Sequence, residues 1–380
     1  MGTLLLYDDS VRSPELRHEI AEAVADPVVF LDHDGRRIVV TGPFEVSIFA
    51  TREDVVDEVW TTDELGIQEL IRDESRPSHL IGPELVLRAV QRAGSASVVV
   101  PPTFRVLVAD YLRAAGVEVV VDAPTWADRR RRKTPWEVEG IERAQRAAET
   151  SMLTATRLLR EAEPTNDGML RFEGELLTSE LIREAMVGQL VALGAESEEV
   201  IVQSGDACFG GHELGSGPIA PDRSLIIDCF PRDRKTGAFS DMTRTFVVGE
   251  PSERLARLHA HCRRALDIAF EAIKPGASDV FARVAGYFES EGFATYLSHG
   301  SSEPVREGFI HALGHGVGLE VHERPLMGRR SDALVAGDVV AVEPGLYLRG
   351  VGGVRLEDTV LVTDDGFERF TDAYPYDLTP

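Results

Sequence analysis

The sequence predicts an α+β protein of two domains, a smaller α/β domain in residues 1–128 and a larger domain in residues 136–380, joined by a basic linker at 129–135. Three observations predict this division. The 380-residue chain is longer than one hydrophobic core usually organises. Its first third alternates β-branched runs with helical patterns, whereas its last part reads as strands with glycine-rich turns. Between them lies a run of four arginines and a lysine.

The composition is that of an acidic globular protein. Charged residues make up 27% and hydrophobic residues 43% of the chain. The net charge of −24 disfavours nucleic acid and anionic membranes as partners. Cys208, Cys229 and Cys262 show no CxxC spacing, so neither a disulfide framework nor a zinc ribbon is expected. No apolar run has the length of a membrane span or signal peptide, so we expect a cytoplasmic protein.

The first domain is expected to be a compact α/β unit without a catalytic constellation. A hairpin is predicted over residues 27–40, because Asp34-Gly35 separates two β-branched runs. Apolar residues at helical spacing predict two helices, and valine runs predict two buried strands. The helices are expected at 84–93 and 103–115, and the strands at 97–100 and 117–121.

The basic run Arg129–Lys133 could mark a localisation signal or a polyanion site. At a domain boundary in an acidic protein, a solvated linker or a contact with the acidic second domain is favoured. Amphipathic patterns beyond it predict helices that start at Thr134 and Ser252, the latter an N-cap. Two more helices are expected at 172–193 and 278–291.

The stretch Leu225–Thr245 carries the first chemical signal. An apolar strand ends in Asp228, a turn reverses the chain, and a second strand carries Asp241. Twelve residues lie between the aspartates, so a two- or four-residue loop would place them directly opposite each other on one face. Carboxylates that close raise each other's pKa unless a cation lies between them. The pair indicates a metal site, and polar edge residues of an exposed hairpin are the alternative.

Further acids and histidines follow in the last third of the chain. They are His311, His315 and His322 within twelve residues, Glu343 at the end of a strand, and Arg355 with Glu357 alternating onto one strand face. Three histidines among glycines and apolar residues are poorly explained as surface decoration. The GxGxxG, HExxH and EF-hand patterns are absent, which argues against a phosphate loop, a zincin and a calcium switch.

Together these motifs resemble the metallopeptidases with the pita-bread fold, which include methionine aminopeptidase, aminopeptidase P and prolidase. The resemblance covers about residues 136–375, and residues 1–123 look like the N-terminal domain of the creatinase, prolidase and aminopeptidase P branch. It implies a pita-bread catalytic domain with a curved antiparallel sheet. It also implies five ligands of a dinuclear metal centre, which are Asp228, Asp241, His315, Glu343 and Glu357. The step between the aspartates is two residues longer than is common in the family, which implies an enlarged hairpin tip.

Four carboxylates and one imidazole suit Mn²⁺, Co²⁺, Fe²⁺ or Zn²⁺, and donor type alone does not distinguish them. We expect two divalent ions, Mn²⁺ first, holding a bridging hydroxide that attacks a polarised peptide carbonyl. By the resemblance, Glu343 is also the general base and proton shuttle, and His311 and His322 hydrogen-bond the substrate carbonyl and the tetrahedral intermediate. His212, in a Gly-Gly-His-Glu loop, matches a family histidine near the scissile bond, and an ordinary loop histidine is the alternative.

Arg355, two residues before Glu357, resembles the Arg-x-Glu of the prolidase and aminopeptidase P branch and is expected to bind substrate. The resemblance therefore implies an Xaa-Pro dipeptidase or aminopeptidase that acts on small peptides as a homodimer. Three alternatives stay open: a creatinase-like C–N hydrolase without metal, a non-prolyl peptidase on the same fold, and a non-catalytic peptide-binding relative. The full carboxylate set argues against the first, because a metal-free site has no need of four acids.

Overall fold

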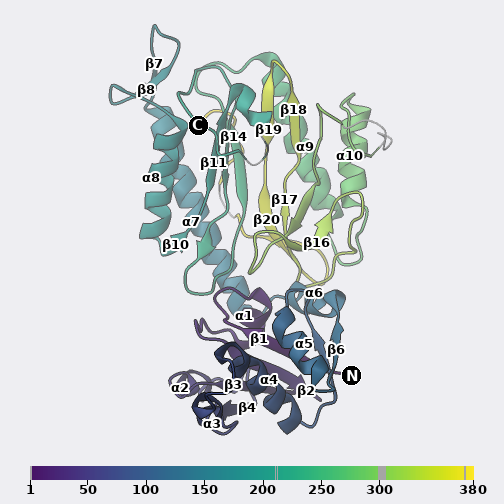
Figure 1. The fold of residues 1–380 in the computed structure, drawn as a ribbon. Coiled ribbons are helices and arrows are strands. Elements are labelled where there is room, and N and C mark those ends of the chain that lie inside the picture. Colours follow the sequence, from purple (N-terminus) through teal and green to yellow (C-terminus); the bar gives the residue numbers. More distant parts are fainter. Residues whose placement is uncertain (1, 210, 212, 298–304, 372–373) are drawn as a thin grey trace. The chain divides into compact units, whose positions relative to one another are not determined.

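The computed structural model describes residues 2–209, 211, 213–297, 305–371 and 374–380 (Figure 1). The chain divides into two compact units, residues 1–130 and 131–380, each with its own hydrophobic core. The candidate site residues that are described all lie in the second unit. Within the described ranges, no helix is both long and apolar enough to cross a membrane.

The first unit is a mixed sheet flanked by helices. Its strands, in the order β4-β3-β2-β1-β5-β6, are β1 (Thr3–Asp8), β2 (Val28–His33), β3 (Arg36–Thr41), β4 (Glu58–Thr61), β5 (Ser97–Val100) and β6 (Glu118–Val121). Its helices are α1 (Pro14–Ile20), α2 (Val46–Phe49), α3 (Ile67–Arg72), α4 (Ile81–Arg92), α5 (Val106–Ala114) and α6 (Ala123–Arg131), with a 3-10 turn at Ser78–Leu80. The predicted β2–β3 hairpin is present, because Asp34 and Gly35 adopt the positive φ angles of 52° and 80° that its turn requires.

The basic run differs from the solvated linker expected at 129–135. It is helical through Arg131, where α6 ends, and α7 begins at Pro135. Most of its cations pair with carboxylates, which allows a cluster of like charges to lie against the protein. The pairs are Arg129–Glu19 at 2.5 Å, Arg130–Glu15 at 3.5 Å, Arg131–Asp338 at 2.7 Å and Lys133–Glu323. Arg131 and Lys133 therefore do contact acids of the second unit, as the other interpretation expected.

The second unit starts with α7 (Pro135–Arg160), which Thr134 and Glu137 cap reciprocally. Its other helices are α8 (Ser179–Ala192), α9 (Glu253–Ala272) and α10 (Val280–Ser290), with a 3-10 turn at Gly205–Phe209. The strands up to α9 are β7 (Glu163–Pro164), β8 (Leu170–Phe172), β9 (Glu175–Leu176), β10 (Ala195–Glu196), β11 (Val200–Ser204), β12 (Leu225–Cys229), β13 (Arg232–Asp233) and β14 (Met242–Phe246). Those after α10 are β15 (Gly314–Gly316), β16 (Glu323–Met327), β17 (Val339–Val342), β18 (Gly345–Leu348), β19 (Gly352–Arg355), β20 (Asp358–Val362) and β21 (Phe367–Arg369).

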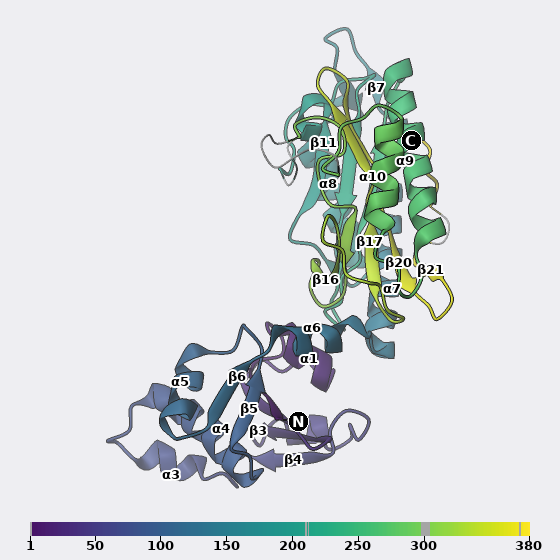
Figure 2. The ribbon, with the colours of Figure 1, turned by 90° about the vertical axis from the view of Figure 1, so that its right-hand side faces the viewer.

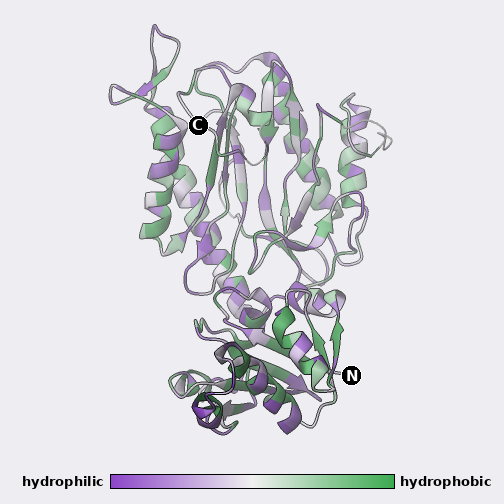
Figure 3. Ribbon diagram, in the orientation of Figure 1, coloured by the Kyte–Doolittle hydropathy of each residue, from purple (hydrophilic) through white to green (hydrophobic). Residues whose placement is uncertain are grey.

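Two antiparallel sheets of this unit position the site. One has the order β11-β12-β14 and the other the order β16-β15-β17-β20-β21. Helices α7 and α8 pack against the first sheet, and α9 and α10 against the second. Figure 1 shows the strands between these helix pairs, and Figure 2 shows α9 and α10 in front of β17 and β20. Figure 3 shows hydrophobic and hydrophilic residues mixed along α8 and α9. The buried residues of each recur every three to four positions, as expected of helices that cover a core on one side.

The helix predicted at 172–193 is wrong at its start. Residues before 177 form a short hairpin of β8 and β9, because Glu173 and Gly174 take positive φ angles of 52° and 85° and reverse the chain. Helix α8 begins at Ser179, where the Thr178 side chain accepts a hydrogen bond from the backbone N–H of Leu181. The cap and the turn outweigh the apolar periodicity that suggested a longer helix.

Candidate metal centre

Asp228 and Asp241 lie on one face of the β12–β14 hairpin, but not directly opposite each other. Asp228 pairs with Thr243, and the same register places Asp241 opposite Phe230. The two aspartates are therefore diagonal neighbours, two positions apart, and their side chains point to the same face. The prediction that the two aspartates are directly opposite is wrong. Their side chains nevertheless lie on the same face, as predicted.

The position of the turn causes this offset. Asp233 donates its N–H to the Ala238 carbonyl at 2.8 Å, which leaves four residues in the loop. The Asp233 carboxylate accepts hydrogen bonds from the N–H and hydroxyl of Thr236, at 2.8 and 2.7 Å. These bonds centre the hairpin between Lys235 and Thr236, whereas direct opposition of the aspartates needs a centre one residue earlier.

The second sheet supplies the other candidate ligands. The register of β17 and β20 places Glu343, just after β17, opposite Glu357, just before β20. His315 in β15 pairs with Ala341 of β17, two positions before Glu343. Because side chains alternate along a strand, His315, Glu343 and Glu357 share one face of this sheet.

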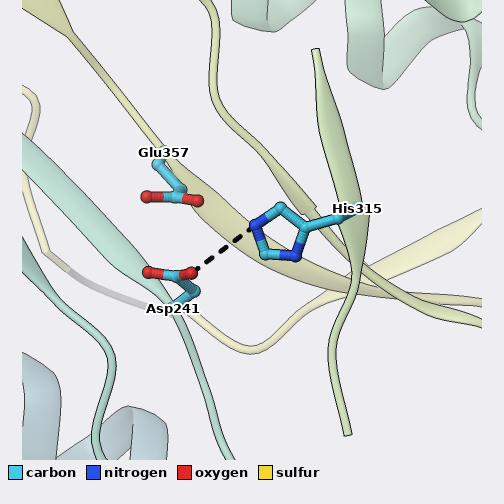
Figure 4. Close-up of side chains that lie close together, drawn as sticks. All are labelled: Asp241, His315 and Glu357. Atoms are coloured by element: carbon cyan, nitrogen blue, oxygen red, sulfur yellow. Dashed lines mark ion pairs between the residues drawn. The ribbon is translucent and has the colours of Figure 1, made fainter. Parts of the chain in front are cut away.

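These residues converge. Asp241, His315 and Glu357 each offer one ligand atom, and the three atoms lie within 4.8 Å of one another (Figure 4). The His315 Nε2 atom is 3.7 Å from Asp241 Oδ2 and 3.9 Å from Glu343 Oε1. Asp228 lines the same cavity. The structure thus brings together all five residues that the resemblance implied as metal ligands, and it draws them from two different sheets.

The histidine is in the form that a metal requires. His315 Nδ1 lies 3.1 Å from the Gly316 carbonyl, which can only accept, so Nδ1 carries the proton. The lone pair on Nε2 then faces the carboxylates. Burial lowers the pKa of His315 to about 4, so the ring is neutral at physiological pH. A neutral imidazole with one nitrogen fixed by a backbone carbonyl is typical of metal ligands.

The protein itself does not supply enough positive charge to balance the clustered carboxylates. Burial, and then the neighbouring acids, raise the pKa values of Asp241 and Glu357 well above their ordinary range. Burial also raises the pKa of Glu343 to about 7, although the Arg355 guanidinium opposes this change. Among the described residues that line the cavity, Arg355 is the only lysine or arginine. One guanidinium beside the four candidate ligand acids leaves a strong preference for added cations.

Two buried oxygen atoms show where a cation fits. Asp228 Oδ1 and Asp241 Oδ1 are inaccessible to solvent and accept no hydrogen bond from the described part of the chain. Unpartnered buried carboxylate oxygens are costly unless a cation or proton satisfies them. Together with the neutral imidazole of His315, they provide hard oxygen and nitrogen donors, which suit first-row divalent metal ions.

Arg355 links the acids to the cavity wall. Its guanidinium donates to Asp228 Oδ2 at 2.6 Å, to the Thr243 hydroxyl at 3.2 Å and to the Tyr347 hydroxyl at 3.1 Å. The Thr243 hydroxyl in turn donates to Glu357 Oε2 at 2.6 Å. Arg355 therefore holds one oxygen of Asp228, and Thr243 holds one oxygen of Glu357. The second oxygen of each of these two acids is left for a ligand. Sequence reasoning missed Thr243 and Tyr347, because a threonine or tyrosine inside an apolar strand looks like ordinary core.

The remaining predicted histidines border the same site. His311 lies 2.7 Å through Nδ1 from the Ala312 carbonyl and 3.1 Å through Nε2 from the Tyr347 hydroxyl. Its Nδ1 is 3.8 Å from Glu343 Oε2. The His322 ring packs edge-on against the His315 ring, with centroids 4.2 Å apart. His212 lies outside the described residues.

The cavity that holds these groups has a volume of about 560 Å³. Apolar side chains form part of its wall, among them Ile201 of β11 and Phe230 just after β12. The pairing of β11 with β12 places Ile201 opposite Asp228, so the apolar wall continues the face that carries the acids. A cavity of this size can hold a small-molecule ligand.

The fold and the site now allow a comparison with known proteins. Residues 139–364 match the model of metallopeptidase family M24. This chain belongs to metallopeptidase family M24. The family predicted from the sequence motifs is thereby confirmed.

Curated relatives of this M24 protein carry peptidase names. It is 39% identical over 135 residues to the Xaa-Pro dipeptidase of Pyrococcus furiosus, an alignment that covers 35% of each chain. It is 30% identical over 224 residues to the Xaa-Pro dipeptidase of Lactobacillus delbrueckii subsp. lactis, covering 56% of this chain and 57% of that one. These alignments therefore span from about a third to just over half of the relatives' lengths.

Solved structures agree with the M24 protein over nearly its whole length. The Xaa-Pro dipeptidase from Bacillus anthracis matches with a TM-score of 0.78 at 24% identity, covering 99% of this chain and 94% of that one. The X-Pro aminopeptidase from Thermotoga maritima MSB8 matches with a TM-score of 0.77 at 19% identity, covering 100% and 97%. The predicted pita-bread fold with a preceding smaller domain is confirmed.

Metal binding by the M24 protein should strengthen as the pH rises from about 6 to about 8. Without metal, Glu343 titrates at about 7, and Asp241 and Glu357 are protonated more readily than ordinary acids. Protons must leave before these oxygens become ligands, so each displaced proton contributes up to about tenfold in affinity per pH unit. Calorimetric titration with Mn²⁺ in buffers of different ionisation enthalpy measures the released protons, and a pH-independent affinity would contradict the expectation.

Replacing Tyr347 with Phe should lower kcat/KM by roughly 10-fold to 100-fold, the usual range for a residue that orients an active-site group. The change removes the hydroxyl between His311 and Arg355 and keeps the ring. Tyr111→Phe, which removes a hydroxyl bonded to Glu84 in the first unit, is the matched control. Steady-state kinetics on both variants tests the expectation, which fails if the two variants behave alike.

Proposed function

We propose that this M24 protein is a divalent-metal-dependent peptidase that cleaves Xaa-Pro bonds in short peptides, as a dipeptidase or an aminopeptidase. The observation that carries the proposal is the convergence of Asp241, His315 and Glu357 in a cavity of peptide size. Curated relatives named Xaa-Pro dipeptidase support the choice of bond. Arg355, in the Arg-x-Glu pattern of the prolyl branch, supports it independently.

The proposed ligands are Asp228, Asp241, His315, Glu343 and Glu357, and they hold two metal ions. When bound, the ions polarise the peptide carbonyl and lower the pKa of the attacking water. The protein contributes a fixed and largely buried frame. Arg355 and Thr243 occupy one oxygen each of Asp228 and Glu357 and so orient the two carboxylates.

Glu343 is the proposed proton carrier. Its carboxylate accepts the proton that water releases on attack and then donates it to the proline nitrogen as the C–N bond breaks. Glu343 lines the cavity and its Oε1 atom lies 3.9 Å from His315 Nε2, so its carboxylate is placed beside the reacting groups. His311 lies beside it, with its Nδ1 atom 3.8 Å from Glu343 Oε2.

The histidines and Arg355 complete the proposed machinery. His311 and His322 border the cavity and are proposed to hydrogen-bond the substrate carbonyl and the tetrahedral intermediate. Arg355 is proposed to bind substrate as well as to orient Asp228. His212 is proposed to contact the peptide near the scissile bond and lies outside the described residues.

Hydrolysis assays with chelator-stripped protein test the proposal. An Xaa-Pro dipeptide, an Xaa-Pro-Yaa tripeptide and a matched Xaa-Ala dipeptide should each be offered with and without added Mn²⁺, Co²⁺ or Zn²⁺. We expect metal-dependent cleavage of the prolyl substrates, and the preferred length separates a dipeptidase from an aminopeptidase.

Other outcomes redirect the assignment. Bound metal without prolyl cleavage would keep the site and favour a non-prolyl peptidase. Cleavage of neither substrate and no bound metal would favour the creatinase-like or peptide-binding alternatives. The choice of Mn²⁺, the homodimer, the cytoplasmic location and the domain bounds 1–128, 129–135 and 136–380 stay predictions.

A further inference from the structure

The two sheets that supply the candidate ligands meet at β14 and β20, and residues on the far side of this junction connect them. Thr243 and Glu357 point into the site, where they hydrogen-bond to each other. Side chains alternate along a strand, so the next residues, Arg244 and Asp358, point away from the site on the opposite face. Arg244 and Asp358 form an ion pair of 2.9 Å, with side chains 1% and 0% exposed.

The Arg244 guanidinium uses each of its five N–H groups. On the site side, Nη1 donates to the backbone carbonyls of Thr243 and Glu357, at 2.9 and 2.8 Å. Nη2 donates to Asp358 Oδ1 at 2.9 Å and to the Tyr374 carbonyl at 3.5 Å, and Nε donates to the Pro375 carbonyl at 3.0 Å. A planar group with this many fixed partners holds the Glu357 backbone against β14 in one position.

The segment Tyr374–Pro380 completes this arrangement. The Tyr376 hydroxyl hydrogen-bonds the second oxygen of Asp358, and its ring stacks on Arg244, with the guanidinium carbon 4.4 Å from the ring centroid. The segment also touches both cores, because Tyr374 packs with the α7–α8 core and Leu378 with the α9–α10 core. The Val247 N–H, just after β14, donates to the Leu378 carbonyl at 2.7 Å.

We propose that Arg244, Asp358 and Tyr376, here called the rear cluster, position Glu357 as a metal ligand, so that the segment 374–380 sets the metal affinity of a site it does not touch. The inference rests on the proposed function in taking Glu357 as a ligand. Asp358 is the residue next to Glu357, and its two oxygens are shared between Arg244 and Tyr376. Removing the Tyr376 hydroxyl leaves the second, buried oxygen of Asp358 without its hydrogen-bond donor. The Arg244–Asp358 pair must then shift for that oxygen to find another donor.

Unlike ordinary core packing, the rear cluster fixes the distance between candidate ligands that lie on two different sheets. Asp241 and Thr243 belong to one sheet and Glu357 to the other, so their separation depends on bonds across the junction. Two such bonds involve Thr359, whose hydroxyl lies 3.1 Å from the Asp241 nitrogen and 2.8 Å from its carbonyl oxygen. Glu357 is also tied directly to Thr243, through its N–H to the Thr243 carbonyl at 3.1 Å and through the side-chain bond given above. Arg244 adds bonds to the carbonyls of the same two residues. A shift at Arg244 therefore changes the distance between ligands of one metal ion while leaving both cores intact.

Calorimetric titration of the metal-free full chain with Mn²⁺ tests the proposal. Tyr376→Phe keeps the aromatic ring and removes only the hydroxyl, which also accepts from Arg369 at 3.3 Å. We expect its Mn²⁺ affinity to fall by roughly 10-fold, the usual scale for a residue that supports a ligand. Tyr287→Phe is the matched control, since this tyrosine is in the same unit and its hydroxyl bonds His261 at 2.9 Å. The control should retain the wild-type affinity.

Urea unfolding of the same metal-free variants separates positioning from packing. We expect both variants to be folded and to unfold cooperatively, and only Tyr376→Phe to lose metal affinity. Wild-type affinity in Tyr376→Phe would overturn the inference, and so would equal losses of affinity in the two variants. Absence of Mn²⁺ binding by the wild-type protein would overturn the proposed function instead. Arg244→Lys keeps the charge but not the fork and should weaken binding further.

Discussion

Replacing Asp241 with Asn should abolish metal binding and lower kcat/KM by at least about 10³-fold, the scale of losing an essential active-site group. The same change should stabilise the metal-free protein. Burial, and next the carboxylates of Glu357 and Asp228, raise the pKa of Asp241 well above its ordinary range. Its charged form is therefore unfavourable in the folded state, and the neutral amide removes that cost while keeping the shape of the side chain.

The sign of the stability effect depends on pH. A carboxyl group whose pKa is raised by folding destabilises the protein above its unfolded pKa, and this cost grows as the pH rises toward the folded value. Asp241→Asn should therefore raise the melting temperature of chelator-treated protein most at about pH 8 and least near pH 4. Scanning calorimetry at both values, with and without Mn²⁺, measures this. The assignment would be refuted if the metal-free variant melted below the metal-free wild-type protein at pH 8. It would also be refuted if added Mn²⁺ still raised the melting temperature of the variant.

Replacing Arg355 with Met should lower the free energy of unfolding of the metal-free protein by about 3–5 kcal/mol, the usual cost of breaking a buried ion pair. Asp228 would lose the guanidinium that lies 2.6 Å from its Oδ2 atom. Asp228 is only 8% exposed, so water cannot replace that partner. Urea denaturation of chelator-treated protein at about pH 8 measures the effect.

Arg324→Met provides the comparison for this prediction. Arg324 pairs with Asp332, but its side chain is 49% exposed, so its loss should cost no more than about 1 kcal/mol. Equal losses in the two variants would mean that Arg355 has no special role in holding Asp228. The loss of unfolding free energy in Arg355→Lys should lie between those of the two methionine variants. Lysine keeps the charge but cannot donate to Asp228, Thr243 and Tyr347 at once.

Much of the site was readable in the sequence because each predicted ligand stands in its own local motif. Asp228 ends an apolar strand, His315 stands among glycines, and Glu343 and Glu357 border apolar strands. The register could not be read in the same way. Whether Asp241 faces Asp228 directly or diagonally depends on the bonds of Asp233 with Thr236, which only the folded turn displays.

The rest of the site comes from contacts between distant residues. Tyr347 and Thr243 have no motif of their own, and their roles depend on an arginine that lies 8 and 112 positions away in sequence. The early start predicted for the helix at 172–193 has a local cause instead. The turn at Glu173-Gly174 and the cap at Thr178 end the apolar periodicity that extends through residues 172–193, and both depend on residues already visible in the sequence.

The ion pairs of the basic run bear on the design of chimeras in which the first unit is exchanged. Arg129 and Arg130 pair with Glu19 and Glu15 in the first unit, whereas Arg131 and Lys133 pair with Asp338 and Glu323 in the second. The unit boundary falls between Arg130 and Arg131, so each of these four pairs lies within one unit. A chimera joined at this peptide bond would inherit every one of these cations together with its own counter-ion. The Arg130–Arg131 bond lies in the last turn of α6, so a junction there would keep these ion pairs but would interrupt that helix.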